Sequence, residues 1–255
     1  MAGVFFMAIY QAIVLGAVQG ITEFLPISSS GHLALISLLF GLQGDLLFGV
    51  ILHVATLIPV TFVYRKELVS LFSNGKKIIY LVVATIPAGV VGLVFSDVID
   101  NMFVNVKMLS WTFFATALML ILCHFIKFKD KKIGLKQAFI YGAFQALAVF
   151  PGVSRSGTCL TAGKVAGVNE RDNVSFAFVM SVPIILASLL LESVKVFTSV
   201  KVVTIGALPI IFGFLSALIF GFISAVIMKK FAFKSNKIFS VYLIVISTIL
   251  LVWKI

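Results

Sequence analysis

The sequence predicts an all-α polytopic membrane protein, on the evidence of its composition, the length of its apolar segments and an internal repeat. Of 255 residues, 61% are apolar and 11% are charged, which leaves too little polar surface for a soluble domain. Apolar stretches as long as a lipid bilayer requires recur along the chain. We therefore expect a single integral membrane domain, residues 1–255, in which the first half (1–130) and the second half (131–255) are inverted repeats.

Six segments are expected to cross the bilayer completely as helices. A helix rises 1.5 Å per residue, so a hydrocarbon layer of about 30 Å needs roughly 20 apolar residues. The segments that meet this requirement are residues 46–64, 78–96, 108–127, 174–193, 204–228 and 238–254.

Two further apolar regions, residues 4–41 and 135–168, are interrupted by polar strings that contain proline and glycine. The strings run from Thr22 to His32 and from Phe150 to Thr158. Backbone outside a helix is tolerated at membrane depth only where protein or a watery cavity covers it. Each interruption is therefore predicted to form the tip of a re-entrant helical hairpin, which enters and leaves the membrane on one side.

The two hairpin regions also repeat each other, because Gln11 to Leu33 aligns without gaps with Gln137 to Cys159. Each half then has one hairpin and three crossings, and since three is odd, the halves begin on opposite faces of the membrane. Identical residues occur at Gln11/Gln137, Ala12/Ala138, Gly16/Gly142, Ala17/Ala143, Gln19/Gln145, Phe24/Phe150, Ser28/Ser154, Ser30/Ser156 and Gly31/Gly157.

The distribution of basic residues predicts the orientation. A net charge of +11 can indicate a nucleic-acid partner, but the basic residues lie in short runs between apolar segments, so no nucleic acid is expected. One side collects the Lys and Arg residues of 65–77, 127–136, 164–171 and 229–237, whereas the other has only Lys107, Lys195, Lys201 and Lys254. Cytoplasmic loops are rich in Lys and Arg. The first hairpin should therefore open outward, and the second should enter from the cytoplasm to meet it near the midplane.

Arg155 is the charged residue of the second tip, which reads PGVSRSGT. An unpaired charge at this depth is costly, so Arg155 needs either the carboxylate of Glu23 or an anionic ligand. The hydroxyl groups of Ser154, Ser156 and Thr158 surround it at the start of a half-helix, where the helix dipole favours anions. These features together predict a phosphate-binding site.

The first tip carries the groups that phosphoryl chemistry requires. Gln19 and Glu23 are four residues apart, so they share one helix face, where they either hold a divalent cation or bond to a neighbouring helix. Ser28 or Ser29 is a candidate nucleophile with His32 as its proton acceptor, or His32 is itself phosphorylated. We expect Ser30 to be a structural cap of the second half-helix.

At these two strings the sequence resembles the bacterial undecaprenyl-diphosphate phosphatase family, also called the bacitracin-resistance protein family. Its signatures are Glu/Gln-x-x-x-Glu followed by Pro-x-Ser-Ser-x-Gly-His, and Pro-Gly-x-Ser-Arg-Ser-x-x-Thr. The closing Thr of the last signature falls on Cys159 here, with Thr158 one position earlier. The resemblance extends through Phe48–Arg65, Ile86–Gly92 and Ser175–Pro183, and so covers nearly the whole chain.

The resemblance implies an enzyme of the bacterial plasma membrane that hydrolyses undecaprenyl diphosphate on the outer leaflet. Such an enzyme recycles the lipid carrier for peptidoglycan synthesis and confers bacitracin resistance. The alternative is a secondary transporter or flippase of a phosphorylated lipid, because paired broken helices are typical of transporters. A homodimer is one oligomeric state that the resemblance leaves open.

The expected roles follow from the same resemblance. The substrate would be a polyprenyl diphosphate, and the cofactor a divalent cation, Mg²⁺ or Ca²⁺, held by Gln19 and Glu23. The catalytic residues would be Glu23, Ser29, His32 and Arg155, and the residues that bind the diphosphate would be Ser28, Ser154, Arg155, Ser156 and Thr158.

Overall fold

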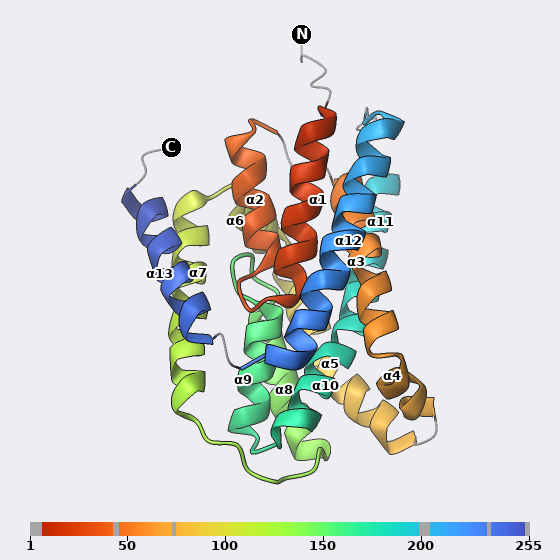
Figure 1. The fold of residues 1–255 in the computed structure, drawn as a ribbon, viewed down its shortest axis with the longest axis vertical. Helices are drawn as coiled ribbons and strands as arrows, with labels where there is room; N and C mark the ends of the chain where they lie inside the picture. Colours follow the sequence, from red (N-terminus) through yellow and green to blue (C-terminus); the bar gives the residue numbers. More distant parts are fainter. Residues whose placement is uncertain (1–6, 43–45, 73–74, 199–204, 234–235, 253–255) are drawn as a thin grey trace.

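The structure, a computed structural model, describes residues 7–42, 46–72, 75–198, 205–233 and 236–252. In these ranges the regular secondary structure consists of helices, and β pairing is limited to an isolated bridge. This confirms the all-α class (Figure 1). The helices are α1 (Ile9–Phe24), α2 (Ser29–Leu39), α3 (Leu46–Val63), α4 (Arg65–Phe72), α5 (Gly75–Val94), α6 (Ser96–Phe103), α7 (Val106–Phe125), α8 (Leu135–Leu147), α9 (Arg155–Val165), α10 (Glu170–Val179), α11 (Ser181–Thr198), α12 (Ala207–Phe231) and α13 (Asn236–Val252).

Each of the six predicted crossing segments overlaps at least one helix of the structure. Four described spans are long and apolar enough to cross a membrane, namely α5, α7, α12 and the stretch Glu170–Leu191 that joins α10 to α11. Helices α3 and α4 count as a fifth if the bent pair is one span. Helix α13 is shorter, at 17 residues, and the predicted ends at residues 204 and 253–254 lie outside the described residues. The chain is a multi-pass membrane protein.

The chain bends by 81° between α3 and α4, where an apolar sequence that prefers lipid is followed by a charged one that prefers water. Helix α3 is almost entirely apolar, whereas α4 begins with Arg65, Lys66 and Glu67. Charged side chains are strongly disfavoured in hydrocarbon, so the chain turns where the charges begin. Figure 1 shows α4 turning aside at the lower end of the molecule.

The two predicted broken helices are helical hairpins. Helices α1 and α2 form the first, and α8 and α9 form the second. In Figure 1 the first hairpin enters from the end at which α13 finishes, the second enters from the opposite end, and their tips meet in the middle of the bundle. The basic α4 and the lysine-rich segment between α7 and α8 lie at the end from which the second hairpin enters. Lys201 and Lys254 lie outside the described residues.

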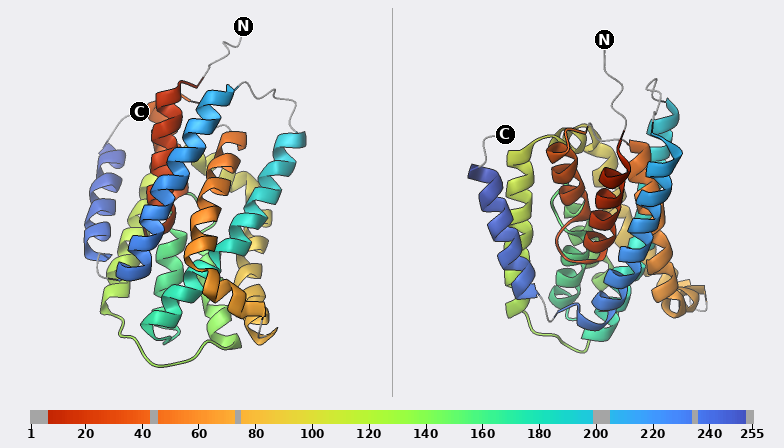
Figure 2. Two further views of the ribbon diagram at one scale, coloured as in Figure 1. Left: turned by 45° about the vertical axis from the view of Figure 1, so that its right-hand side comes forward. Right: turned by 45° about the horizontal axis from the view of Figure 1, so that its top comes forward.

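Helix packing is exchanged between the two halves. The first hairpin helix of the first half, α1, packs along α12, and its counterpart α8 packs along α5. The last helices of the two halves, α7 and α13, pack against each other, and both views in Figure 2 keep this pair and the α1–α12 pair side by side. Each hairpin is thus held by a crossing helix of the other half. This exchange supports the predicted division after residue 130, which stays a prediction.

The residues that are identical in the repeat cap equivalent helices. The side-chain oxygen of Gln11 accepts a hydrogen bond from the backbone N–H of Ala8 at 2.9 Å, and that of Gln137 accepts one from Gly134 at 3.2 Å. These contacts satisfy backbone donors at the starts of α1 and α8 that have no partner within the helix. The alignment of the repeat places Gln11 on Gln137 and Ala8 on Gly134, so the two contacts are equivalent.

The half-helices that follow the tips are capped in the same way. Ser28 accepts from the N–H of Gly31 at 3.4 Å, and Ser154 accepts from Gly157 at 3.2 Å. The expectation that Ser30 is the cap was wrong, because α2 begins at Ser29 and Ser28, two residues before Ser30, takes the N-cap position. Ser28 does so with φ of 72°, a left-handed conformation that costs a non-glycine residue roughly 1 kcal/mol or more.

Small residues allow α1 and α12 to approach closely. A Cβ atom at Gly16 would lie 2.3 Å from the carbonyl oxygen of Gly213, and one at Gly20 would lie 2.6 Å from that of Ala217. Glycine at four-residue spacing is the usual device by which membrane helices bring their backbones together. The carbonyl of Ile13 uses this proximity to accept a hydrogen bond from Ser216 at 2.8 Å.

We expect Gly16→Ala to destabilise the protein by about 1–3 kcal/mol, because the added methyl group meets backbone that cannot move aside. Gly49→Ala is the matched control, since a Cβ atom there meets nothing within 4 Å. Thermal unfolding of both variants in detergent measures the difference. Equal melting temperatures would show that the α1–α12 contact does not limit stability.

Candidate functional site

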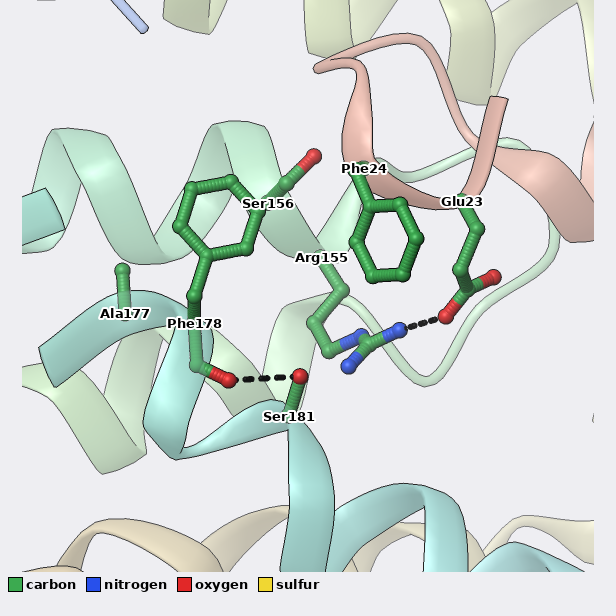
Figure 3. Close-up of a pocket in the computed structure, with 7 residues that line it drawn as sticks. All are labelled: Glu23, Phe24, Arg155, Ser156, Ala177, Phe178 and Ser181. Carbon is green, nitrogen blue, oxygen red and sulfur yellow. Dashed lines mark hydrogen bonds and ion pairs between the residues drawn. The ribbon is translucent and has the colours of Figure 1, made fainter. Parts of the chain in front are cut away.

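The two hairpin tips are joined by an ion pair at the centre of the molecule. Arg155, the first residue of α9, donates through Nη2 to Oε1 of Glu23, near the end of α1 (Figure 3). Glu23 is 5% exposed and the side chain of Arg155 is 17% exposed. Ser156 adds a second link between the tips by donating to the backbone oxygen of Leu25 at 2.8 Å. The sequence left two partners possible for Arg155, the carboxylate of Glu23 or an anionic ligand, and the structure shows the pair with Glu23.

The second oxygen of Glu23 orients two further groups. Ser29 donates its hydroxyl hydrogen to Oε2 at 2.6 Å, and Gln19 donates from Nε2 at 3.1 Å. Gln19 is held in turn by Thr56 of α3, whose hydroxyl oxygen lies 3.3 Å from the same nitrogen. With its hydrogen directed at a carboxylate, the Ser29 oxygen keeps its lone pairs for an electrophile, which is the arrangement of a serine nucleophile and its base.

His32 is held away from this pair by contacts of its own. Nδ1 lies 2.7 Å from the backbone oxygen of Ser28, and Nε2 lies 2.7 Å from the hydroxyl of Tyr242 on α13. A carbonyl oxygen only accepts, so Nδ1 carries the hydrogen and Nε2 of the neutral ring accepts from Tyr242. Phe113 closes the other side of the ring by an edge contact. Among the described residues, therefore, the structure pairs Ser29 with Glu23 and not with His32.

Helix α7 fixes the second tip through Thr116. Its hydroxyl donates to the backbone oxygen of Gly152 at 3.0 Å and accepts from the backbone N–H of Ser154 at 3.2 Å. Gly152 has φ of 89°, which a side chain would strain, and a Cβ atom there would lie 2.0 Å from the Thr112 hydroxyl oxygen. The tip is consequently held rigid, and the hydroxyl groups of Ser154 and Ser156 lie 3.2 Å apart at its end.

Thr158 is not brought to the ion pair. Its side chain is fully buried and its hydroxyl donates to the backbone oxygen of Arg155 at 2.9 Å, within its own helix. Ser28 contributes differently from the other serines, because its backbone oxygen holds His32 while its hydroxyl caps α2. Glu23, Ser29, Arg155, Ser154 and Ser156 thus gather at the tips, with Gln19 and His32 beside them.

Two buried polar atoms at this site lack a protein partner. They are Oε1 of Gln19 and Nη1 of Arg155, for which the described residues supply no hydrogen bond. Buried polar groups are nearly always satisfied in native proteins. A cation beside Oε1 of Gln19 and an anion beside Nη1 of Arg155 would satisfy both atoms.

Several residues of the site gave no signal in the sequence. Thr56, Thr116 and Tyr242 carry hydroxyl groups inside apolar spans. Threonine in such a span usually bonds to its own helix, so it does not by itself indicate a site. His32 and Tyr242 are 210 positions apart, so no local pattern connects them. Hydroxyl groups of the surrounding helices bond to the hairpin tips, and this can be recognised only once the positions of the helices are known.

Comparison with known proteins extends over most of the chain. The model of the family described as bacitracin resistance protein BacA matches residues 12–249. An undecaprenyl-diphosphatase of Thermosipho africanus is 38% identical over 93% of this chain and 97% of its own length. One of Bacteroides thetaiotaomicron is 40% identical over 83% and 85%, and an undecaprenyl-diphosphatase 4 of Bacillus cereus is 39% identical over 81% and 82%.

Proposed function

Because the chain belongs to the bacitracin resistance protein BacA family, we propose that it hydrolyses undecaprenyl diphosphate to undecaprenyl phosphate and inorganic phosphate. The observation that carries this function is the group formed by Ser29, Glu23 and Arg155 inside a lipid-facing helical bundle. A nucleophile with a carboxylate base, next to a guanidinium, suits transfer of a phosphoryl group. A lipid substrate accounts for the position of this group at membrane depth.

Ser29 attacks the terminal phosphorus in this proposal. Its Oγ–P bond forms as the P–O bond to the inner phosphate breaks, its proton passes to Oε2 of Glu23, and undecaprenyl phosphate leaves. A water molecule then attacks the phosphorus of the phosphoserine, the Oγ–P bond breaks, and the Ser29 oxygen takes the proton back from Glu23. Inorganic phosphate leaves with both hydrogens of the water, and Ser29 and Glu23 are restored. The 2.6 Å contact between Ser29 and Glu23 lies within the distance that direct proton transfer requires.

Arg155 supplies the positive charge for this step. Without substrate it is neutralised by Glu23, and a phosphate group that enters between the tips offers it a more highly charged partner. Glu23 is then left to accept the Ser29 proton. Ser154 and Ser156, whose hydroxyl groups lie at the same tip, add donors to the phosphate oxygens as charge builds up.

His32 assists from a fixed position. Both ring nitrogens have partners, so the ring is poorly placed for phosphorylation, and this favours Ser29 as the nucleophile. We assign His32 to holding the Ser28 segment, and through it Ser29, in the strained conformation that directs the hydroxyl at Glu23.

The residues present fit a divalent cation that is bound together with the substrate. Among the described residues no group of three or more His, Cys, Asp or Glu side chains gathers at one point, but Mg²⁺ commonly uses one or two carboxylates together with substrate phosphates. Glu23 and the unpartnered Oε1 of Gln19 would hold it. The cation, when bound, neutralises charge on the phosphoryl oxygens.

We place the protein in the bacterial plasma membrane with its site open to the extracytoplasmic side. The lysine-rich segments at the other end support this orientation, because they favour the cytoplasm. In this position the enzyme recycles the lipid carrier of cell-wall synthesis and confers bacitracin resistance. Both tips come from one chain, so the proposed site is complete in a single copy, whether or not the protein is a homodimer.

Release of inorganic phosphate from undecaprenyl diphosphate by the purified protein in detergent tests the function. We expect hydrolysis that depends on Mg²⁺ or Ca²⁺ and stops when a chelator is added. The same protein in vesicles distinguishes the alternative, a transporter or flippase of a phosphorylated lipid. Movement of the lipid between leaflets without phosphate release would support that alternative and contradict the enzyme.

Tyr242→Phe is expected to lower kcat/KM by about tenfold, because it removes the hydroxyl that holds Nε2 of His32 and leaves a buried ring nitrogen unsatisfied. Phosphate release measured over a range of substrate concentrations reports this change. Tyr10→Phe, on an exposed face of α1, is the control and should have no effect. Wild-type kinetics in Tyr242→Phe would show that the orientation of His32 does not matter.

A further inference from the structure

A small pocket borders the ion pair, and its wall on α10 and α11 has no role in the reaction described above. The pocket is a narrow recess, and its lining includes Glu23, Arg155 and Ser156 from the tips and Ala177, Phe178 and Ser181 from α10 and α11. Figure 3 shows the guanidinium of Arg155 between the Glu23 carboxylate on one side and Ser181 on the other. The pocket is therefore a second environment for the same cation.

The two ends of the Arg155 guanidinium are used differently. Nη2 donates to Glu23, which also holds Ser29, whereas Nη1 is buried and has no partner among the described residues. A buried cationic N–H group without an acceptor is strongly unfavourable. Nη1 is therefore available to donate to an anionic group of a ligand.

Ser181 supplies a hydroxyl group on the far wall of the pocket. It is 4% exposed, and its hydroxyl donates to the backbone oxygen of Phe178 at 2.6 Å, within the same crossing segment. The hydroxyl of Ser181 can rotate about its side-chain bonds and donate to a ligand instead. The apolar walls formed by Ala177 and Phe178 exclude water, which strengthens polar contacts inside.

We propose that Nη1 of Arg155 and the hydroxyl of Ser181 form a second anion subsite, which binds the inner, lipid-linked phosphate while the terminal phosphate lies at Ser29. The inference rests on the proposed function and extends it to substrate choice. The guanidinium is a planar fork whose two ends can contact neighbouring phosphate groups. Its Glu23 end adjoins the Ser29 centre, so its other end lies where the second phosphate of a diphosphate can reach. The subsite makes the enzyme selective for diphosphates over monophosphates.

Ser181→Ala tests the subsite in the full-length protein. We expect kcat/KM for undecaprenyl diphosphate to fall by about 10- to 100-fold, as for loss of a hydrogen bond to a charged group. Hydrolysis of p-nitrophenyl phosphate, which has a single phosphate, should not change. Likewise, the inhibition constant of pyrophosphate should rise about tenfold while that of inorganic phosphate stays the same.

Ser247→Ala is the matched control, because Ser247 is also buried and donates to a backbone oxygen three residues earlier, but lies on α13. Unchanged selectivity in Ser181→Ala, or an equal loss on both substrates, would overturn the subsite. If the wild type hydrolyses neither substrate, the proposed function fails. The melting temperature then still tests the subsite. Pyrophosphate should raise it more than inorganic phosphate does in the wild type, and this difference should be lost in Ser181→Ala.

Discussion

Ser29→Ala is expected to lower kcat for phosphate release by at least about a thousandfold, the scale of loss when a catalytic nucleophile is removed. Ser29 is the one candidate nucleophile of the first tip whose hydroxyl hydrogen is directed at the Glu23 carboxylate. Its replacement removes both the attacking atom and the proton that Glu23 receives. Binding depends on Arg155 and the serines of the other tip, so KM should change far less than kcat.

Two measurements separate this result from a loss of structure. Ser37 lies about two turns further along α2 than Ser29. Ser37→Ala should keep wild-type kinetics and have the same melting temperature as Ser29→Ala. Rapid acid quench of the wild type during turnover, followed by mass spectrometry, should find phosphate on the peptide that contains Ser29. Phosphate on His32, or full activity of Ser29→Ala, would contradict the assignment.

Removal of one member of the Glu23–Arg155 pair should abolish activity and also destabilise the protein. Glu23→Gln leaves Arg155 unpaired at membrane depth, and Arg155→Gln leaves Glu23 unpaired. Loss of one partner from a buried ion pair costs about 3–5 kcal/mol. We expect both variants to show a lower melting temperature in detergent and phosphate release near the background rate.

The double variant Glu23→Gln, Arg155→Gln separates the two effects. Neither buried charge is then unpaired, and the two amides can bond to each other, so the melting temperature should return towards that of the wild type. Activity should stay absent, because both the proton acceptor and the phosphate-binding cation are gone. A double variant as unstable as the single ones, or an active single variant, would show that the pair has a different role.

The repeat explains why the site is asymmetric. Identical positions such as Gln11/Gln137 and Ser28/Ser154 cap equivalent helices, so they serve the scaffold of both halves. The nucleophile and the guanidinium differ instead, since the alignment that pairs Ser28 with Ser154 also pairs Ser29 with Arg155. Two tips that meet at the centre can form an ion pair only if one carries the acid and the other the base.

The sequence alone determined the class of the fold, the two broken hairpins, the repeat and the need of Arg155 for a carboxylate or an anionic ligand. These features depend on local composition and on the solvent, because lipid allows only helices to span it and allows breaks only where protein covers them. A charge at that depth must also find a partner. Each of these arguments needs only a stretch of the chain and knowledge of its surroundings.

The tertiary structure decided which groups contact one another within the site. Ser29 bonds to Glu23 and His32 bonds to Tyr242, whereas the sequence had left open whether His32 acts as the base of Ser28 or Ser29 or is itself phosphorylated. Thr158 bonds to its own helix, and Ser181 reaches the pocket from a segment that had no polar pattern. Hydrogen bonds depend on the rotation of each helix to within a fraction of a turn. That rotation is set by side-chain packing between helices far apart in sequence, such as Gly16 against Gly213.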